Sequence, residues 1–132
     1  RYKRGVFALD TALFLHDLTD RTPHKFHMAF PYGYNTSSPK AAGILCSCKK
    51  EPYYSLGIAL VDTPAGNTVR AYNAEKTLCE ILKPISHTDI QIITDAFKRY
   101  AGRKDKNIPL LSEYAHQLRV EKRLRPYLEV LL

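Results

Sequence analysis

The pattern of apolar and polar positions divides this 132-residue chain into a first part of about residues 1–72 and a second part of about residues 73–132. The first part opens with apolar positions at helical spacing and then alternates apolar and polar positions, as half-buried strands do. The sequence therefore predicts an amino-terminal helix and a small, mostly antiparallel sheet. We expect a helix over about residues 11–18 capped by Asp10, strands over about 25–30 and 43–49, a loop over 31–39, and a hairpin over about 57–72.

In the second part, apolar positions recur every three or four residues, which is typical of amphipathic helices. Asn73 and Asn107 are good capping residues, and residues 86–89 resemble a capping box. We expect Gly102 to end one helix and Pro126 to kink or break the last. A group of about four helices following a sheet predicts an α+β fold, and the chain length suits one domain over 1–132.

The composition narrows the class of partner. The chain carries 20 Lys and Arg against 13 Asp and Glu, a formal net charge of +7, which favours a polyanion, nucleic acid first. Its three cysteines cannot all pair, and it has neither a leader nor an apolar run long enough for a membrane, so we expect a cytoplasmic protein. The chain opens on Arg1 and its only methionine is Met28, so we expect that an amino-terminal part is absent from it.

Most of the basic excess is local. Residues 95–125 contain nine Lys and Arg against four Asp and Glu, a net charge of +5. Long cationic side chains at helix ends and in the loop between helices suit DNA phosphates, although a solvated helix face is the alternative. No aromatic residue is interleaved to stack bases, which disfavours single-strand binding by this run. The candidate phosphate contacts are Lys98, Arg99, Arg103, Lys104, Lys106, Arg119, Lys122, Arg123 and Arg125.

The sequence contains no recognisable motif for catalysis or metal binding. Cys46 and Cys48 form C-x-C rather than C-x-x-C, and Cys79 stands alone, so we expect all three to be small packing residues. His16 lies on an apolar helix side, where a hydrogen-bonded packing role is expected. No acid and lysine share a strand face as a metal-dependent nuclease requires, and no glycine-rich phosphate loop is present. We therefore expect no catalytic residue, no metal, no cofactor and no enzymatic activity.

Six segments, in order, resemble one family. They are GVFALDTALFLHDLTDRTP at 5–23, FPYGYN at 30–35, TPAGNTV at 63–69, YNAEKTLCEIL at 72–82, DIQIITDAFKRY at 89–100 and RVEKRLRPYLEVLL at 119–132. Together they resemble the carboxy-terminal domain of AbiEi-type antitoxins of abortive-infection (type IV) toxin–antitoxin systems.

That resemblance implies an antitoxin that also represses its own operon in a phage-defence system. Operator DNA would be read by an amino-terminal winged helix-turn-helix, which this chain lacks. The cognate toxin would be a nucleotidyltransferase-like enzyme that is neutralised without a stable complex. This chain would be the non-catalytic carboxy-terminal domain, adding accessory phosphate contacts to DNA binding. The alternatives are a protein-interaction domain that mediates dimerisation or toxin contact without nucleic acid, and a degenerate nuclease-like enzyme; the oligomeric state stays open.

Overall fold

The chain folds into one mixed sheet and a group of helices at its side. The structure, a computed structural model, describes residues 2–131 and the side chains of residues 2–129, so that Arg1 and Leu132 lie outside it. Within the described residues the strands stand in the sheet order β3-β2-β1-β5-β4. Their bounds are β1 (Val6–Phe7), β2 (His27–Pro31), β3 (Leu45–Lys49), β4 (Ile58–Asp62) and β5 (Thr68–Tyr72).

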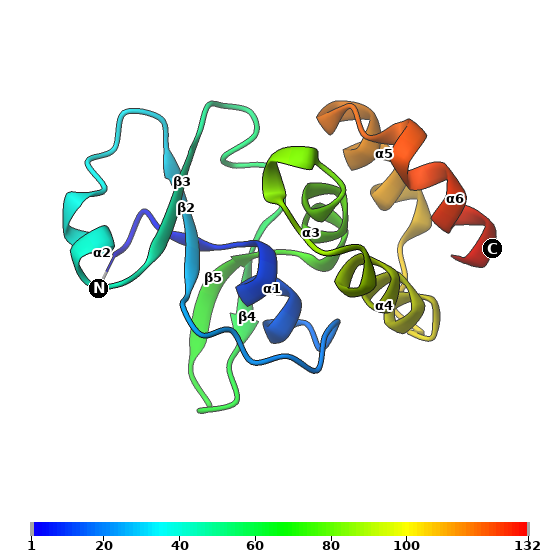
Figure 1. The fold of residues 1–132 in the computed structure, drawn as a ribbon, viewed down its shortest axis with the longest axis horizontal. Coiled ribbons are helices and arrows are strands. Elements are labelled where there is room, and N and C mark those ends of the chain that lie inside the picture. The colour runs from blue at the N-terminus through cyan, green and yellow to red at the C-terminus, as the bar shows by residue number, and fades with distance from the viewer. Residues whose placement is uncertain (1, 132) are drawn as a thin grey trace.

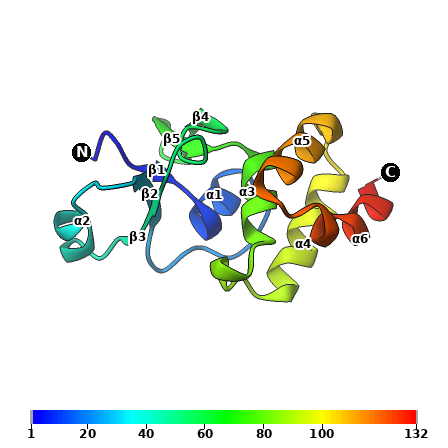
Figure 2. The ribbon, with the colours of Figure 1, turned by 90° about the horizontal axis from the view of Figure 1, so that it is seen from above.

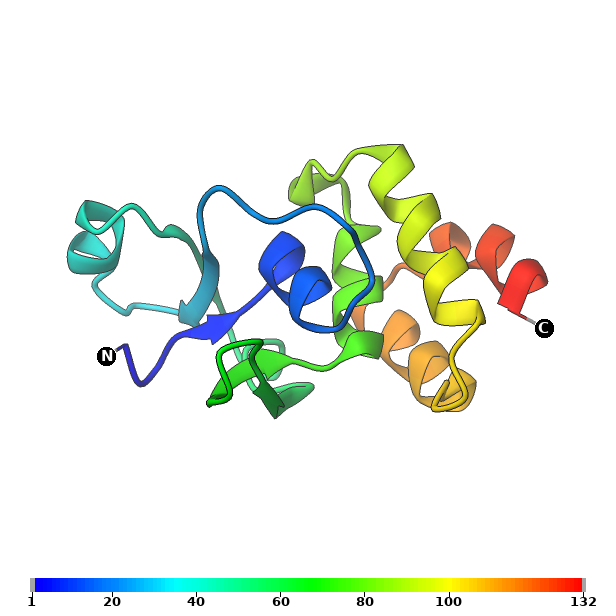
Figure 3. The ribbon, with the colours of Figure 1, turned by 90° about the horizontal axis from the view of Figure 1, so that it is seen from below.

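The helices are unevenly placed: most lie at the end of the molecule opposite to the amino terminus, and one lies near the amino terminus. They are α1 (Leu9–Leu15), α2 (Ser37–Ala41), α3 (Ala74–Ile81), a short 3-10 turn (Pro84–Ser86), α4 (Ile90–Ala101), α5 (Ile108–Leu118) and α6 (Glu121–Leu131). Figure 1 shows the sheet and α2 towards the N-terminal end, and α4, α5 and α6 towards the C-terminal end. Helix α1 lies between the sheet and α3 in both perpendicular views (Figures 2 and 3).

The expected α+β class is confirmed, with a carboxy-terminal group of helices after the sheet. The sheet is mixed: β1 pairs with β2 and β4 with β5 in antiparallel fashion, whereas β1 pairs with β5 and β2 with β3 in parallel. The predicted hairpin is the β4–β5 pair, in which Ile58 lies opposite Tyr72 and Asp62 opposite Thr68.

Three local predictions for the first part are wrong. The two-residue strand β1 was not expected, because its short run carries too few positions to show a period. Asp10 is in the first turn of α1 rather than at its cap, since the helix follows directly on the chain's turn out of β1 and Ala8 occupies the cap position. Helix α2 interrupts the loop expected over 31–39, and the Asn35 side chain accepts a hydrogen bond from the Ser37 amide at its start (3.0 Å).

Most of the predicted helix ends are confirmed. The side chain of Asn73 accepts from the Lys76 amide at 2.8 Å, and that of Asn107 accepts from the Leu110 amide at 3.0 Å, so both caps are confirmed. No capping box forms at 86–89; Asp89 alone caps α4, which ends at Ala101 with Gly102 as its cap. Helix α6 continues through Pro126, so the predicted break is wrong.

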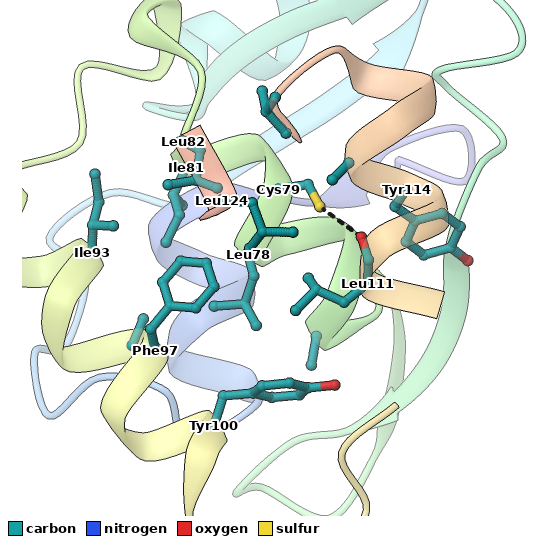
Figure 4. Packing of buried hydrophobic residues seen from close by; sticks show 14 of the residues in the cluster. Leu78, Cys79, Ile81, Leu82, Ile93, Phe97, Tyr100, Leu111, Tyr114 and Leu124 are labelled. Carbon is teal, nitrogen blue, oxygen red and sulfur yellow. Dashed lines mark hydrogen bonds between the residues drawn. The ribbon is translucent and has the colours of Figure 1, made fainter. Parts of the chain in front are cut away.

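A large apolar core joins α1 to the carboxy-terminal helices. Figure 4 shows side chains of α3, α4 and α5 converging around Leu78, which is fully buried. The thiol of Cys79 points at the Leu111 carbonyl, 3.6 Å away. Each fully buried leucine of this kind contributes about 1.5–3 kcal/mol to folding, so packing of these helices stabilises the surface that they present outwards.

A smaller core lies under the sheet. It consists of Val6, Ala8, Ala29, Tyr54 and Tyr72. The Tyr72 hydroxyl donates to the Tyr54 carbonyl at 2.7 Å, which fastens the segment before β4 to β5. In the part of the chain that the structure describes, no helix combines the length and the apolar character needed to cross a membrane.

Candidate functional site

The predicted phosphate contacts come from helices α4 and α6, from the loop between α4 and α5, and from Arg119 between α5 and α6. Helix α4 packs against α6 through the rings of Phe97 and Tyr127, which stack with their centroids 4.4 Å apart. Leu124 of α6 is buried in the core, and α5 contacts α6 as well. Because the apolar stripes face inwards, the charged positions of these helices are held on the outer surface.

Six of the nine candidate cations are exposed and unneutralised. They are Lys98, Lys104, Arg119, Lys122, Arg123 and Arg125. Among the described side chains, none of the six takes part in an ion pair. Lys122 and Arg125 are three residues apart on α6 and share one side of it. Arg123 precedes Tyr127 by four residues and so lies towards the contact with α4. We call these six residues the cationic surface.

The four acids of residues 95–125 do not neutralise this surface, because each is engaged elsewhere. Asp95 pairs with Arg99 at 2.9 Å and Asp105 with Arg103 at 2.8 Å. Glu121 lies 3.2 Å from the His116 ring, and Glu113 accepts from the Gln117 amide at 3.3 Å. The cationic surface therefore has its charges free for an external anion.

The three remaining candidates are occupied within the fold. Arg99 is the partner of Asp95, and the Lys106 ammonium donates to the Ala101 carbonyl at the end of α4 (2.9 Å). Two nitrogens of the Arg103 guanidinium donate to the Asp105 carboxylate at 2.8 Å, and the third donates to the His16 carbonyl at 2.9 Å. The bond to Asp105 raises the pKa of Arg103 and lowers the pKa of Asp105. Arg103 thus ties the loop before α5 to the end of α1.

A matched pair of substitutions separates these two groups of cations. We expect Arg103→Gln to lower the free energy of unfolding by about 1–2 kcal/mol, because the His16 carbonyl and Asp105 lose their donor. Lys104→Gln, next to it and exposed, should change the stability by less than about 0.5 kcal/mol. Urea unfolding of both variants measures the difference. Equal effects would show that the bond to His16 does not hold the loop.

The histidine and cysteine predictions are partly confirmed. The Nε2 atom of His16 lies 2.8 Å from the Tyr72 carbonyl and donates to it, and burial lowers the pKa of this imidazole. Cys79 is buried as expected, and burial raises the pKa of its thiol to about 12. Cys48 is exposed on the edge strand β3, so the prediction that all three cysteines are packed is wrong for it. Among the described residues, no group of three or more His, Cys, Asp or Glu is placed to hold a metal ion.

The sequence did not reveal that α3 carries buried charges. The Lys76 ammonium is fully buried, donates to the carbonyls of Tyr53 and Leu56 at 2.8 and 3.0 Å, and lies 3.7 Å from the centroid of the Tyr72 ring. Glu80 is buried on the same helix and pairs with Lys49 of β3 at 2.6 Å. These contacts join α3 to the sheet. They serve the fold and offer no reactive group to solvent.

Comparison with known proteins adds no assignment. No protein-family model matches the chain, and no curated protein matches it either.

Proposed function

We propose that this chain is the non-catalytic carboxy-terminal domain of an antitoxin and transcriptional autorepressor, and that it adds phosphate contacts to DNA binding through the cationic surface. The ordered resemblance to AbiEi-type antitoxins supports the antitoxin role. The observation that carries the DNA contact is the set of six exposed cations with no internal ion pair among the described residues. Phosphate contacts of this kind give affinity and orientation but carry no sequence information.

The proposal makes binding strongly dependent on salt. Each phosphate that a protein neutralises contributes about −0.9 to the slope of log K against log salt. If all six cations reach duplex DNA, the slope is about −5. Sequence recognition then belongs to the amino-terminal winged helix-turn-helix that the resemblance implies.

Reversing three charges of α6 tests the contact. We expect Lys122→Glu, Arg123→Glu and Arg125→Glu together to weaken duplex binding at least about tenfold and to reduce the magnitude of the salt slope by about 3. Fluorescence anisotropy with a labelled duplex over a series of salt concentrations measures both quantities.

The matched control reverses three exposed cations elsewhere, Arg21, Lys40 and Lys50, which changes the net charge by the same amount. If both triple variants lose affinity equally, only net charge matters and the cationic surface is a solvated face. Loss confined to the α6 variant is the expected result.

The antitoxin role is tested in cells. Its partner is a nucleotidyltransferase-like toxin that the antitoxin opposes without a stable complex, so rescue rather than co-purification is the readout. Expression of this chain in toxin-arrested cells should restore growth. Failure to rescue, with the chain folded and present, would remove antitoxin activity from these residues.

A second candidate function, a protein-interaction domain, is favoured by the edge strand β4. The Asn73 amide donates to the Gly57 carbonyl, and the Thr63 amide donates to the Asn67 carbonyl. Because hydrogen-bonded pairs alternate with non-hydrogen-bonded pairs along two antiparallel strands, the backbone amides and carbonyls of Leu60 and Asp62 point away from β5. The Leu60 side chain is 75% exposed. An uncovered edge of this kind, charged only at its last residue Asp62, can pair with a second copy. A concentration-dependent dimer in sedimentation that Leu60→Lys abolishes would establish this function, whereas a monomer at all concentrations would exclude it.

A further inference from the structure

A shallow groove of about 350 Å³ crosses the face of the sheet, far from the cationic surface. Its lining comes from the amino-terminal segment and four strands or their ends, and no helical residue contributes. The strand register places Phe7 opposite Met28 and next to Ala71, so these side chains share one face. Side chains two residues apart on a strand share a face. The apolar floor of the groove is therefore completed by three residues that each precede a residue of this face by two positions: Phe26, Ile44 and Val69.

Aromatic surface is available in this groove. The rings of Phe7 and Phe26 meet edge to face at 69° with their centroids 5.6 Å apart, which leaves ring faces without an aromatic partner. Phe26 is 55% exposed, so part of its ring is open to solvent. Base–aromatic stacking needs such a free ring face, and it tolerates any base sequence.

The rim of the groove is cationic. Its charged lining residues are Lys3 and Arg70, and no Asp or Glu lines it. Lys3 alone directs its charge to the groove, because Arg70 lies between Val69 and Ala71 in β5 and its side chain leaves on the other face of the sheet. There the Arg70 guanidinium donates to the Lys3 carbonyl and, at 3.4 Å, to the Tyr54 hydroxyl. Neither cation forms an ion pair with another described residue. An apolar, aromatic floor beside unpaired positive charge complements a ligand with flat apolar rings and an anionic backbone.

We propose that this groove binds single-stranded DNA, with unpaired bases on Phe26 and a backbone phosphate on Lys3. Duplex DNA keeps its base faces stacked inside the helix, so an aromatic platform selects unpaired bases. A peptide adding to a sheet needs a free edge, whereas β1 lies at the centre of this sheet with partners on both sides.

One feature favours DNA over RNA. The apolar floor matches the thymine methyl group, which uracil lacks. The inference is independent of the proposed duplex contact of α6, because the groove and the cationic surface are built from different elements.

The groove contains a natural probe. Met28 is the chain's only methionine and lines the floor. In the chain labelled with ¹³C at the methionine methyl group, the single resonance should shift in a saturable manner on addition of an oligothymidine of about a dozen nucleotides. It should shift much less with oligouridine. No shift at saturating oligothymidine, an equal shift with oligouridine, or tighter binding of a Glu-rich peptide would overturn the assignment.

Variants locate the contact. Phe26→Ala should weaken binding of a fluorescein-labelled oligothymidine at least about tenfold, while Phe26→Tyr, which keeps a ring, should retain it. Lys3→Gln should reduce the salt slope by about 1. Ile85→Ala, which truncates another exposed apolar side chain outside the groove, should have no effect. The α6 triple reversal should retain the Met28 shift, so failure of one proposal is distinguishable from failure of the other. Unchanged oligothymidine binding by Phe26→Ala would refute the groove.

Discussion

Replacing Tyr100 by phenylalanine is expected to lower the free energy of unfolding by about 2–4 kcal/mol, although one oxygen atom is removed. The Tyr100 side chain is fully buried, and its hydroxyl donates to the Glu75 carboxylate at 2.6 Å. The same oxygen accepts from the Asn107 amide at 2.7 Å. Burial and the bond to Glu75 raise the pKa of the phenol, so it stays protonated and able to donate. Phenylalanine would leave a buried carboxylate and a helix-capping residue without this partner.

Chemical denaturation of Tyr100→Phe, with Tyr114→Phe as the control, measures the effect. Tyr114 is a buried tyrosine of α5 whose hydroxyl accepts one long bond, from the Asn73 amide group at 3.3 Å. Its removal should cost about 1 kcal/mol or less. If the two variants lose the same stability, the Glu75 carboxylate is not held by Tyr100. A much larger loss of stability in Tyr100→Phe would also show that the bond from the Asn107 amide to the Tyr100 hydroxyl stabilises the start of α5.

The difference between these tyrosines shows where sequence reasoning stops. Asn73 and Asn107 could be predicted as caps, because capping is set within three residues of the chain. The hairpin of β4 and β5 was predictable for the same reason, since its turn chemistry is local. The parallel pairing of β2 with β3 and of β1 with β5 is not local, and no residue pattern states it.

Burial of α3 is the clearest failure of pattern reading. An amphipathic helix is expected to bury one stripe, yet the whole of α3 is buried, including Glu75, Lys76 and Glu80. An amphipathic pattern assigns charged positions to solvent, but α3 contacts α1, α4 and α5 and approaches the segment before β4. Each of these charged side chains binds a partner that lies far away in the chain, and one carboxylate oxygen of Glu80 has no hydrogen-bond partner among the described residues.

In the candidate site too, local features were predictable from the sequence, and contacts between distant residues were not. The sequence predicted which residues are cationic and that they lie at helix ends and in the loop between helices. It could not predict that Arg103 is held by Asp105 and the His16 carbonyl, because the second contact crosses 87 positions of the chain. The apolar groove was hidden for a similar reason: Phe7, Met28 and Val69 meet only when three strands assemble.

Lys76→Met is expected to cost stability that grows with pH. Burial lowers the pKa of the Lys76 ammonium to about 8, against a usual value near 10.5 in the unfolded chain. At pH 7 the ammonium is charged in both states, and methionine removes its bonds to the Tyr53 and Leu56 carbonyls. That loss is about 2–4 kcal/mol. Between pH 8 and 10.5 the unfolded chain binds this proton more tightly than the folded one, so the wild-type protein gains stability as the pH rises.

Lys76→Met has no ammonium to titrate, so it does not gain this stability. The difference in free energy of unfolding between the wild-type protein and the variant should therefore increase by about 2–3 kcal/mol between pH 8 and 10. Cys79 and the buried tyrosines also titrate in alkali, in the opposite direction: their folded pKa values are raised, so they destabilise the fold above about pH 9. Those contributions are present in both proteins, so most of their effect is removed in the difference; the Lys76 charge itself lowers the pKa of Cys79 slightly, and that part remains. Urea unfolding at pH 7 and 9.5, with Lys83→Met as a partly exposed lysine control, isolates the Lys76 contribution. A deficit that stays constant with pH would mean that the ammonium is solvated, and that it does not fasten the segment before β4 to α3.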